Sequence, residues 1–451
     1  MNAAASSSFV LKAHLLWWDD DPYFHGHATQ HSVPKGAMAI GEDGRIAWVG
    51  EADALPEAFG AWPSVDRHDT LVLPGFIDAH LHFPQSGIIG AYGTDLLDWL
   101  DTYTFPEESR FGDRVHAASI AATFADALLY YGVTSACVFS TIHPAALEEL
   151  AAAFDARGMG LVSGKTAMDR NAIPTLQDSA QSAYDESKAL IEALEPRYER
   201  FDYAVTPRFA ITSTEAQLEV CGALHAEFPQ TRMQTHINES AREIQTVAQL
   251  FPNDASYLDV YDRFGLVTDR ALFAHGIHTT PAEMTRMAQA GASVVHCPTS
   301  NTFLGSGLFN PGANREAGVN IGIGCDIGGG THFSPFVTMQ EAYKVARFHD
   351  QSLRAAETYY WHTLGNARVM KTHTDTGSLS AGKWADFVVL RDPINDPIAA
   401  LRLERVETDE QRLFAYQFFA PRVETWTRGV QRTTPPAHRR PHLKTTPARR
   451  T

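Results

Sequence analysis

From about residue 72 onwards, short apolar runs alternate with longer amphipathic stretches along the chain. Eight of the apolar runs have the length and the β-branched content that are typical of buried strands. They are residues 72–79, 133–139, 160–163, 203–206, 233–237, 272–274, 293–296 and 320–325. The stretches between them carry helix signals. Residues 115–132 have apolar positions at helical spacing and stop at Gly132, while Thr280, Pro281 and Glu283 form a capping-box start.

This alternation predicts an α/β fold, a (β/α)₈ barrel of the TIM type. Parallel strands need helical crossovers, and eight strand-helix repeats over about 300 residues are enough to close a sheet into a barrel. An open doubly wound sheet is the alternative, because it is built from the same repeating unit.

The two chain ends have a different pattern. Residues 1–73 contain short strand-like runs, a Gly-Glu-Asp-Gly hairpin signal at 41–44 and no long helix. Strand-like runs return after about Met370, in TGSLSAGKWADFVVLRDP and FAPRVETWTRGVQR. We therefore expect residues 1–73 and 371–430 to form one small β-sandwich domain beside a barrel of residues 74–370. Residues 431–451 hold six Lys or Arg, four Pro and no acidic residue, so we expect a disordered basic tail.

Charge and composition exclude several partners. The 451 residues include 53 acidic and 37 basic ones, a net charge of −16, so nucleic acid is not an expected partner. No run approaches the roughly 18 apolar residues of a membrane span, and no basic segment precedes the first short apolar run. We expect a soluble cytoplasmic protein without membrane contact. The four cysteines are scattered, without a C-x-x-C pair, which argues against a disulfide framework or a cysteine zinc site.

Histidines stand at the ends of several predicted barrel strands. His80 and His82 are two residues apart, and alternation along a strand puts both imidazoles on one face, toward the barrel mouth. His236 ends the fifth predicted strand, His275 follows the sixth and Asp326 follows the eighth. Because strand ends converge in a barrel, we expect these residues to meet. Imidazole nitrogens and a carboxylate oxygen suit a divalent metal such as zinc, with a position left for water.

At these residues the sequence resembles a known family. PGFIDAHLHFPQ, HINE, AHG and GCDIGGG are similar to motifs of the amidohydrolase superfamily, whose fold is a (β/α)₈ barrel with a small β domain from both chain ends. The resemblance covers about residues 9–430, with GSLSAGKWADFVVLRDP as the return into the small domain. It is closer to the guanine deaminase family, through LLDWLDTYTFPEE, GKTAMDRNA, TPRF, HCPTSNTFLGSGLF and DIGGGTHFSPF. Residues 86–92 and His332, at the expected pocket rim, depart from some members.

Carried over residue by residue, the resemblance implies one Zn²⁺ per chain with four ligands, namely His80, His82, His236 and Asp326. It implies three catalytic residues: Glu239 as the proton shuttle, His275 as the residue that positions water, and Asp326. A metal of this kind lowers the pKa of bound water toward about 7, and a carboxylate three residues beyond a ligand can move the proton. The resemblance also implies a homodimer.

The substrate side of the site follows from the same resemblance. Gln85, Arg208 and Phe209 would line a guanine pocket together with His236 and Glu239. Gln85 offers a donor and an acceptor, the cationic fork of Arg208 suits a carbonyl, and Phe209 can stack on a purine. The implied function is zinc-dependent hydrolytic deamination of guanine to xanthine and ammonia.

Several alternatives are open at this stage. The substrate could be another aminated ring, such as 8-oxoguanine, a pterin or an s-triazine. A binuclear amidohydrolase would bridge two metals with a carboxylated lysine, for which Lys165 is the candidate, although its context GKTAMDRNA is similar to mononuclear guanine deaminases. A non-catalytic barrel relative would not be expected to retain all four ligands, Glu239 and His275. The zinc deaminases with H-x-E and P-C-x-x-C ligands are excluded, because this chain has CPTSN instead.

Overall fold

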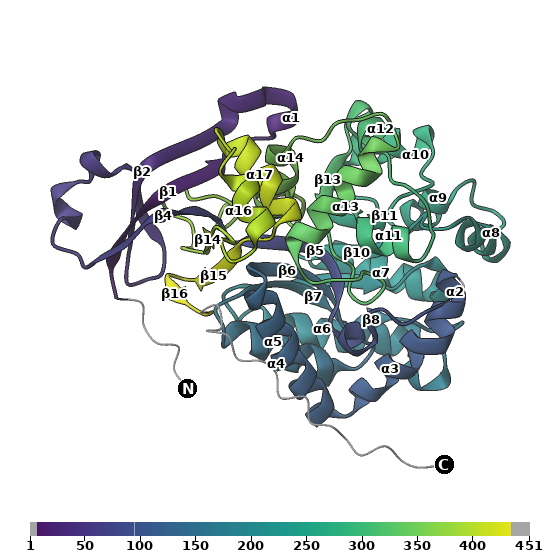
Figure 1. Cartoon of the computed structure of the whole chain (residues 1–451). Coiled ribbons are helices and arrows are strands. Elements are labelled where there is room, and N and C mark those ends of the chain that lie inside the picture. The colour runs from purple at the N-terminus through teal and green to yellow at the C-terminus, as the bar shows by residue number, and fades with distance from the viewer. Residues whose placement is uncertain (1–6, 94, 434–451) are drawn as a thin grey trace, which may run out of the picture.

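The structure is a computed structural model of the chain and describes residues 7–93 and 95–433 (Figure 1). Two sheets organise it: a parallel barrel in the middle of the chain, and a second sheet made by both chain ends. Figure 1 shows the second sheet, with purple and yellow strands side by side, next to the barrel and its surrounding helices.

The barrel contains eight parallel strands in the order β5-β6-β7-β9-β10-β11-β12-β13. Their bounds are β5 (Phe76–His82), β6 (Val133–Phe139), β7 (Gly160–Gly164), β9 (Phe201–Pro207), β10 (Arg232–Ile237), β11 (Ala271–His275), β12 (Ser293–His296) and β13 (Asn320–Ile323). A two-residue strand, β8 (Thr166–Ala167), pairs with β9 in addition. The predicted (β/α)₈ barrel is confirmed, and an open doubly wound sheet is wrong.

Backbone hydrogen bonds close the barrel just after β13. The amide of Asp326 donates to the carbonyl of His80 at 2.9 Å, and the amide of His82 donates to the carbonyl of Ile327 at 2.6 Å. Closure therefore joins the segment after the eighth strand to the end of the first. It brings two stretches nearly 250 residues apart into contact, and both of them carry predicted metal ligands.

Helices connect and surround the barrel strands (Figure 1). Between β5 and β13 they are α2 (Leu96–Trp99), α3 (Phe105–Ser109), α4 (Arg114–Tyr130), α5 (Pro144–Asp155), α6 (Ala180–Leu194), α7 (Glu215–Glu227), α8 (Ala241–Leu250), α9 (Tyr257–Asp262), α10 (Pro281–Ala290), α11 (Pro298–Phe303) and α12 (Pro311–Ala317). After β13 follow α13 (Pro335–Arg347), α14 (Ala355–Tyr360) and α15 (Asn366–Val369).

Local signals explain where two of these helices begin and end. The capping box predicted for α10 is present: Thr280 accepts from the Glu283 amide, and the Glu283 carboxylate accepts from the Thr280 amide. Asp113 caps α4 by accepting from the amide of Val115, and Gly132 follows that helix with φ +92°. Each cap satisfies backbone groups that a helix end leaves unpaired.

The second sheet has seven strands in the order β16-β15-β14-β4-β1-β2-β3. Their bounds are β1 (Phe9–Trp18), β2 (Gln30–Ile40), β3 (Ile46–Glu51), β4 (Ser64–Pro74), β14 (Phe387–Arg391), β15 (Arg422–Thr427) and β16 (Val430–Gln431). The pairing of β14 with β4 joins the two chain ends. This confirms the small β domain from both ends, and the predicted hairpin turn at 41–44 lies between β2 and β3.

Two details of the chain ends differ from the prediction. The expected first barrel strand, residues 72–79, is divided between two sheets, because β4 ends at Pro74 and β5 begins at Phe76. The region after Met370 also contains two helices, α16 (Pro397–Leu403) and α17 (Asp409–Phe418), where only strands are predicted. A short helix, α1 (Pro22–His25), lies near the N-terminus.

The expected tail overlaps the second sheet at its first residue. Gln431 pairs with Trp426 in β16, so it belongs to the second sheet. Residues 434–451, on which the rest of that expectation falls, lie outside the described residues. Among the helices of residues 7–93 and 95–433, none is long and apolar enough to span a membrane.

Small and medium apolar side chains fill the barrel interior. One buried cluster draws Ile77, Ala79, Cys137, Val162, Ala204, Leu272, Ala274 and Val295 from six of the strands, and α15 contributes Ala367 and Val369. The barrel is therefore a packed core, which also encloses Gln234 in the middle of β10, whose Oε1 accepts from the Cys137 thiol at 3.1 Å.

Candidate active site

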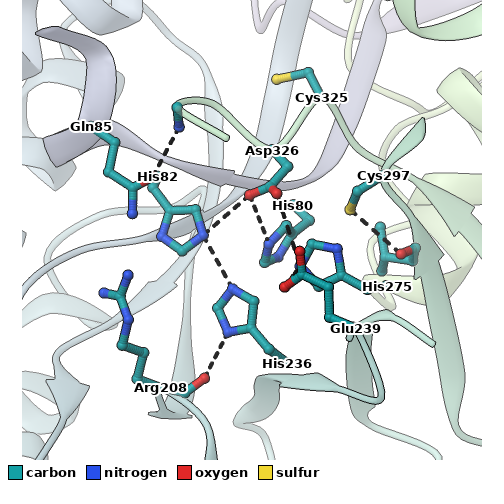
Figure 2. A network of polar contacts seen from close by, with 12 residues as sticks. His80, His82, Gln85, Arg208, His236, Glu239, His275, Cys297, Cys325 and Asp326 are labelled. Atoms are coloured by element: carbon teal, nitrogen blue, oxygen red, sulfur yellow. Dashed lines mark hydrogen bonds and ion pairs between the residues drawn. The ribbon is translucent and has the colours of Figure 1, made fainter. Parts of the chain in front are cut away.

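The four predicted metal ligands meet at the strand ends. Nε2 of His80 lies 3.2 Å from Oδ1 of Asp326, and Nε2 of His82 lies 3.3 Å from the same oxygen. Nε2 of His82 is also 3.2 Å from Nε2 of His236, as Figure 2 shows. Three imidazole nitrogens and one carboxylate oxygen thus face one small volume. The side chains of all four residues are buried.

The protonation of the ligand cluster suits a cation. Nδ1 of His236 lies 2.7 Å from the carbonyl of Arg208, which can only accept, so the ring proton is on Nδ1 and the Nε2 lone pair faces the cluster. Burial lowers the pKa of His82 to about 4 and that of His236 well below its usual value. Nε2 of His80 is buried and forms no hydrogen bond with any described residue. His82 and His236 are therefore neutral imidazoles with nitrogen lone pairs that could bind a metal ion.

Asp326 supplies the negative charge of this cluster. Burial alone would raise the pKa of its carboxyl, but the close contacts with the imidazoles of His80 and His82 outweigh burial and hold the pKa well below its usual value. The donor set of three nitrogens and one anionic oxygen fits a divalent metal of zinc type.

The backbone is unusual at three of the strand ends. His275 and Asp326 have φ values of +72° and +52°, and Asn238, between His236 and Glu239, has φ +50°. Left-handed conformations are disfavoured for residues with a Cβ and tend to gather at functional sites. Of these residues, His275 and Asp326 approach each other, with Nε2 of His275 3.9 Å from Oδ2 of Asp326.

Glu239 lies beside the ligand cluster and has two different neighbours. Its Oε1 accepts from Oγ of Ser306 at 3.0 Å, and its Oε2 is 3.3 Å from Nε2 of His275. Nδ2 of Asn301 donates to Nδ1 of His275 at 2.9 Å, which leaves the ring proton of His275 on Nε2, facing Glu239. Burial, with the charges of Glu243 and Asp326, raises the pKa of Glu239 well above its usual value. A buried carboxyl in this setting can hold and release a proton.

The backbone of Glu239 is held by the next helix. Its amide donates to Oε2 of Glu243 at 2.8 Å, and the same oxygen accepts from the Ser240 amide in the capping box of α8. Tyr257 donates to the other oxygen of Glu243 at 2.9 Å. The loop above β10 is therefore anchored by a fully buried carboxylate.

The predicted substrate residues line a pocket next to the cluster. Gln85, Arg208 and Phe209 are each at most 4% exposed, and they share the pocket with His82, His236, Glu239, His275 and Asp326. It encloses about 390 Å³ of empty space, counted together with its opening to solvent. Figure 2 shows Gln85 and Arg208 on one side of the histidines, with Glu239 and His275 on the other.

Sequence reasoning missed the apolar wall of this pocket. Its members are Leu96 and Trp99 of α2, Leu100 of the π-helical turn Leu100–Thr104, and Leu304 after α11, with Gly329 beside them. Leu96, Trp99 and Leu100 follow helical i, i+3, i+4 spacing, which is equally typical of a core-facing helix. Nothing local distinguishes a pocket wall from a core face.

A buried polar network lies behind Gln85 and Arg208. Nη1 of Arg208 donates to both carboxylate oxygens of Glu108, at 2.8 and 2.7 Å. Nε2 of Gln85 donates to Oε1 of Glu108 at 2.9 Å, and Oε1 of Gln85 accepts from the Gly328 amide at 3.0 Å. Glu108 is fully buried in α3 and was not among the predicted site residues.

Lys165, the candidate metal bridge, and His332, expected at the pocket rim, are bound by other groups. Lys165 is buried and forms ion pairs with Asp178 and, at 3.3 Å, with Glu186. An ammonium group held by two carboxylates is not a carboxylated metal bridge. His332 accepts from the Ser334 amide at 2.9 Å and packs edge-on against another ring, that of Tyr131.

Cys297 lies near His80, His275 and Asp326, within 4.8 Å of a ligand atom of each. Its thiol donates to the Val295 carbonyl at 3.5 Å (Figure 2). Burial raises the pKa of this thiol well above its usual value, which makes it a protonated core group.

Comparisons with known proteins find a family and relatives that match most of the chain. The Amidohydrolase family matches residues 71–424. Guanine deaminase of Escherichia coli (strain K12) is 40% identical over 386 residues, which cover 85% of this chain and 87% of that protein.

Solved structures extend the likeness to nearly the whole chain. Guanine deaminase from Bradyrhizobium japonicum matches with a TM-score of 0.90 at 33% identity, covering 94% of this chain and 99% of that one. Guanine deaminase from C. acetobutylicum, solved with bound guanine in the active site, matches with a TM-score of 0.85 at 26% identity, covering 94% and 100%. The likeness therefore includes the second sheet as well as the barrel.

Proposed function

The chain belongs to the amidohydrolase family, and from this premise we propose that it hydrolyses guanine to xanthine and ammonia. The observation that carries the proposal is a buried pocket in which a four-residue ligand cluster adjoins the polar pair Gln85 and Arg208. The cluster suits hydrolysis at an aromatic C–NH₂ group, and the polar pair suits the edge of a purine. The relatives named above at 33% identity or more are guanine deaminases, and a further guanine deaminase was solved with guanine in its active site.

The family depends on metals, and we propose one zinc ion per chain. Its ligands would be His80, His82, His236 and Asp326, which offer the nitrogen and oxygen donors that zinc prefers. When bound, zinc supplies water activation, because it lowers the pKa of water toward about 7. The ion pairs of Lys165 speak against a second, lysine-bridged metal.

In this proposal Glu239 moves the protons of the reaction. Its Oε2 accepts a proton from the attacking water and delivers it to a ring nitrogen next to the carbon that carries the amine. A second transfer moves the remaining proton of the added hydroxyl to the amine, so that the C–N bond breaks, ammonia leaves and the hydroxyl oxygen becomes the carbonyl of xanthine. Ser306 holds Oε1, so the reactive oxygen is the one beside His275. His275, with its Nε2 proton facing this space, orients the nucleophile.

The remaining pocket residues orient the ring and exclude water. Gln85 and Arg208 would bind the polar edge of guanine, and Phe209 would pack against its face. Trp99 and Leu100 close the apolar side of the pocket. Partial enclosure strengthens each hydrogen bond to the substrate, because the surroundings have a low dielectric constant.

A substrate panel tests this proposal. Ammonia release should be measured from guanine, 8-oxoguanine, adenine, a pterin and an s-triazine at equal concentration, with zinc determined by elemental analysis. We expect guanine to be preferred by roughly 10²-fold or more, because a mismatched donor leaves buried polar groups unpaired. Inert guanine beside rapid turnover of another ring would reject the substrate, and two tightly held metals would reject the mononuclear site.

The resemblance also implies association of two chains. We propose a homodimer on that basis, and size-exclusion chromatography with light scattering measures it directly. A monomer at micromolar concentration would contradict this part of the proposal.

A further inference from the structure

We propose that Glu108 is a positioning residue that sets the hydrogen-bond polarity of the substrate pocket and thereby selects the edge of the purine. This inference rests on the proposed function, which assigns Gln85 and Arg208 to the guanine edge. Glu108 is fully buried in α3 and binds both of these residues with one carboxylate.

The first role of Glu108 is to keep Arg208 charged and fixed. Arg208 is 3% exposed, and a buried guanidinium is unfavourable unless an opposite charge and hydrogen bonds compensate it. Both oxygens of Glu108 accept from Nη1 of Arg208. Phe105, in the same helix, has its ring centroid 5.5 Å from the guanidinium carbon. Glu108 binds only Nη1 and Arg208 lines the pocket, so Nη2 and Nε remain available to a substrate.

The second role is to orient the Gln85 amide. An amide can be turned so that its oxygen and nitrogen exchange places, and its neighbours decide the orientation. The Glu108 carboxylate only accepts, so it requires Nε2 of Gln85 on its side. The Gly328 amide only donates, so it requires Oε1 on the other side. Both neighbours demand the same orientation, which leaves the pocket one donor and one acceptor in a fixed order.

A fixed order distinguishes two kinds of purine edge. Guanine carries an N–H donor at N1 beside a carbonyl acceptor at C6. In 2,6-diaminopurine the reacting amine at C2 is the same, but N1 is an acceptor and C6 carries a donating amine. The two rings thus present opposite hydrogen-bond polarity along one edge. A pocket whose donors and acceptors stand in a fixed order can pair with the edge of guanine. With 2,6-diaminopurine the same order leaves buried donors and acceptors unpaired.

The test replaces Glu108 by glutamine, which keeps its size. Oε1 of Glu108 accepts from both Arg208 and Gln85, and Oε2 accepts from Arg208, so in Glu108→Gln the new NH₂ group faces a donor of Arg208 whichever way the amide turns. When the NH₂ group takes the place of Oε1 it also faces Nε2 of Gln85, so the Gly328 amide alone then holds Gln85, whose orientation is no longer fixed from both sides. We expect KM for guanine to rise roughly tenfold or more, while the guanine to 2,6-diaminopurine ratio of kcat/KM falls by a similar factor. Zinc content should stay near that of the wild type.

Glu107 provides a matched control in the same helix. It pairs with Arg110 at 2.7 Å, and that arginine is exposed. Glu107→Gln removes the same charge from α3, yet we expect KM and the substrate ratio to stay unchanged. A Glu108→Gln enzyme that loses kcat equally on both substrates, or keeps the wild-type ratio, would show that Glu108 is only structural.

A second variant covers failure of the first to fold. The exchange Gln85→Glu with Glu108→Gln returns one carboxylate to the network, where it can accept from the Gly328 amide and from position 108. We expect this double variant to fold and bind zinc while its preference for guanine stays low. Full recovery of that preference would overturn the inference. A wild-type enzyme inert on guanine would reject the proposed function instead, so the two failures are distinguishable.

Discussion

At the scale of single residues, the chemistry of the site depends on carboxylates with different partners. Asp326 faces the imidazoles of His80 and His82, whereas Glu239 contacts Ser306 and lies 3.3 Å from His275. Two carboxylates in one pocket can therefore take separate roles, one as a ligand and one as a proton carrier. The third carboxylate, that of Glu108, binds Gln85 and Arg208 instead and acts on the substrate side of the pocket.

Replacing Glu239 by glutamine separates these roles. Glu239→Gln keeps the size and polarity of the side chain but removes the proton carrier, so kcat should fall by roughly 10² to 10⁴-fold. Zinc content should stay normal, because Glu239 is not proposed as a ligand. Elemental analysis and initial rates with guanine measure both. Glu219→Gln, an exposed position in α7, serves as the control. Loss of zinc in Glu239→Gln would make the residue a ligand and contradict the assignment.

At the scale of elements, the junction of the two sheets lies at one glycine. Gly75 separates β4 from β5, and its amide donates to the carbonyl of Asp386 at 2.9 Å. A Cβ atom at this position would lie 2.3 Å from Oγ1 of Thr134, at the start of β6. The close approach lets one continuous segment leave the second sheet and enter the barrel.

Adding that Cβ should destabilise the fold. We expect Gly75→Ala to lower the free energy of unfolding by about 1–3 kcal/mol, the usual effect of overpacking a buried site. Gly87→Ala is the control, because its Cβ would meet its nearest neighbour, Oε1 of Glu107, at an ordinary 3.5 Å. Urea unfolding followed by tryptophan fluorescence measures both variants. Equal stability of the two would show that Thr134 can move aside at little cost.

At the scale of the whole molecule, a buried ion pair joins the barrel to the second sheet. Arg200, just before β9, donates to the carboxylate of Asp386, just before β14, and their side chains are 7% and 3% exposed. Asp386 also accepts from the Arg428 amide at 2.9 Å, after β15. One carboxylate thus links three segments that are far apart in the sequence.

Removing this carboxylate should loosen the junction. Asp386→Ala leaves a buried guanidinium without its partner, and such a loss typically costs about 3–5 kcal/mol. Asp69→Ala is the control, since Asp69 is 77% exposed and pairs with Arg391 at 3.2 Å. Exposed ion pairs contribute about 0–1 kcal/mol to the free energy of unfolding. Differential scanning calorimetry should show a lower temperature of the first unfolding transition for Asp386→Ala only. Similar temperature shifts in both variants would contradict the idea of a buried link.

Local information in the sequence was sufficient for the barrel and for the ligand positions. Strand and helix periodicities are properties of neighbouring residues, and a histidine at a strand end points to the barrel mouth whatever the rest of the chain does. His80, His82, His236 and Asp326 could therefore be predicted to converge. The helices α16 and α17 had local signals as well, in the caps Asp396 and Thr408, but the strand-like runs around them masked these signals.

Only the tertiary structure decided the surroundings of these residues. Glu108 and Arg208 are 100 positions apart, and no local pattern pairs them. Leu96 and Trp99 have the spacing of a core face, yet they line the pocket. The end of β4 at Pro74 follows from strand pairing with β14, which lies more than 300 residues further on. Each of these contacts depends on how the barrel closes and how loops pack over its mouth, whereas the sequence by itself determines periodicity, strand ends and the types of side chain placed there.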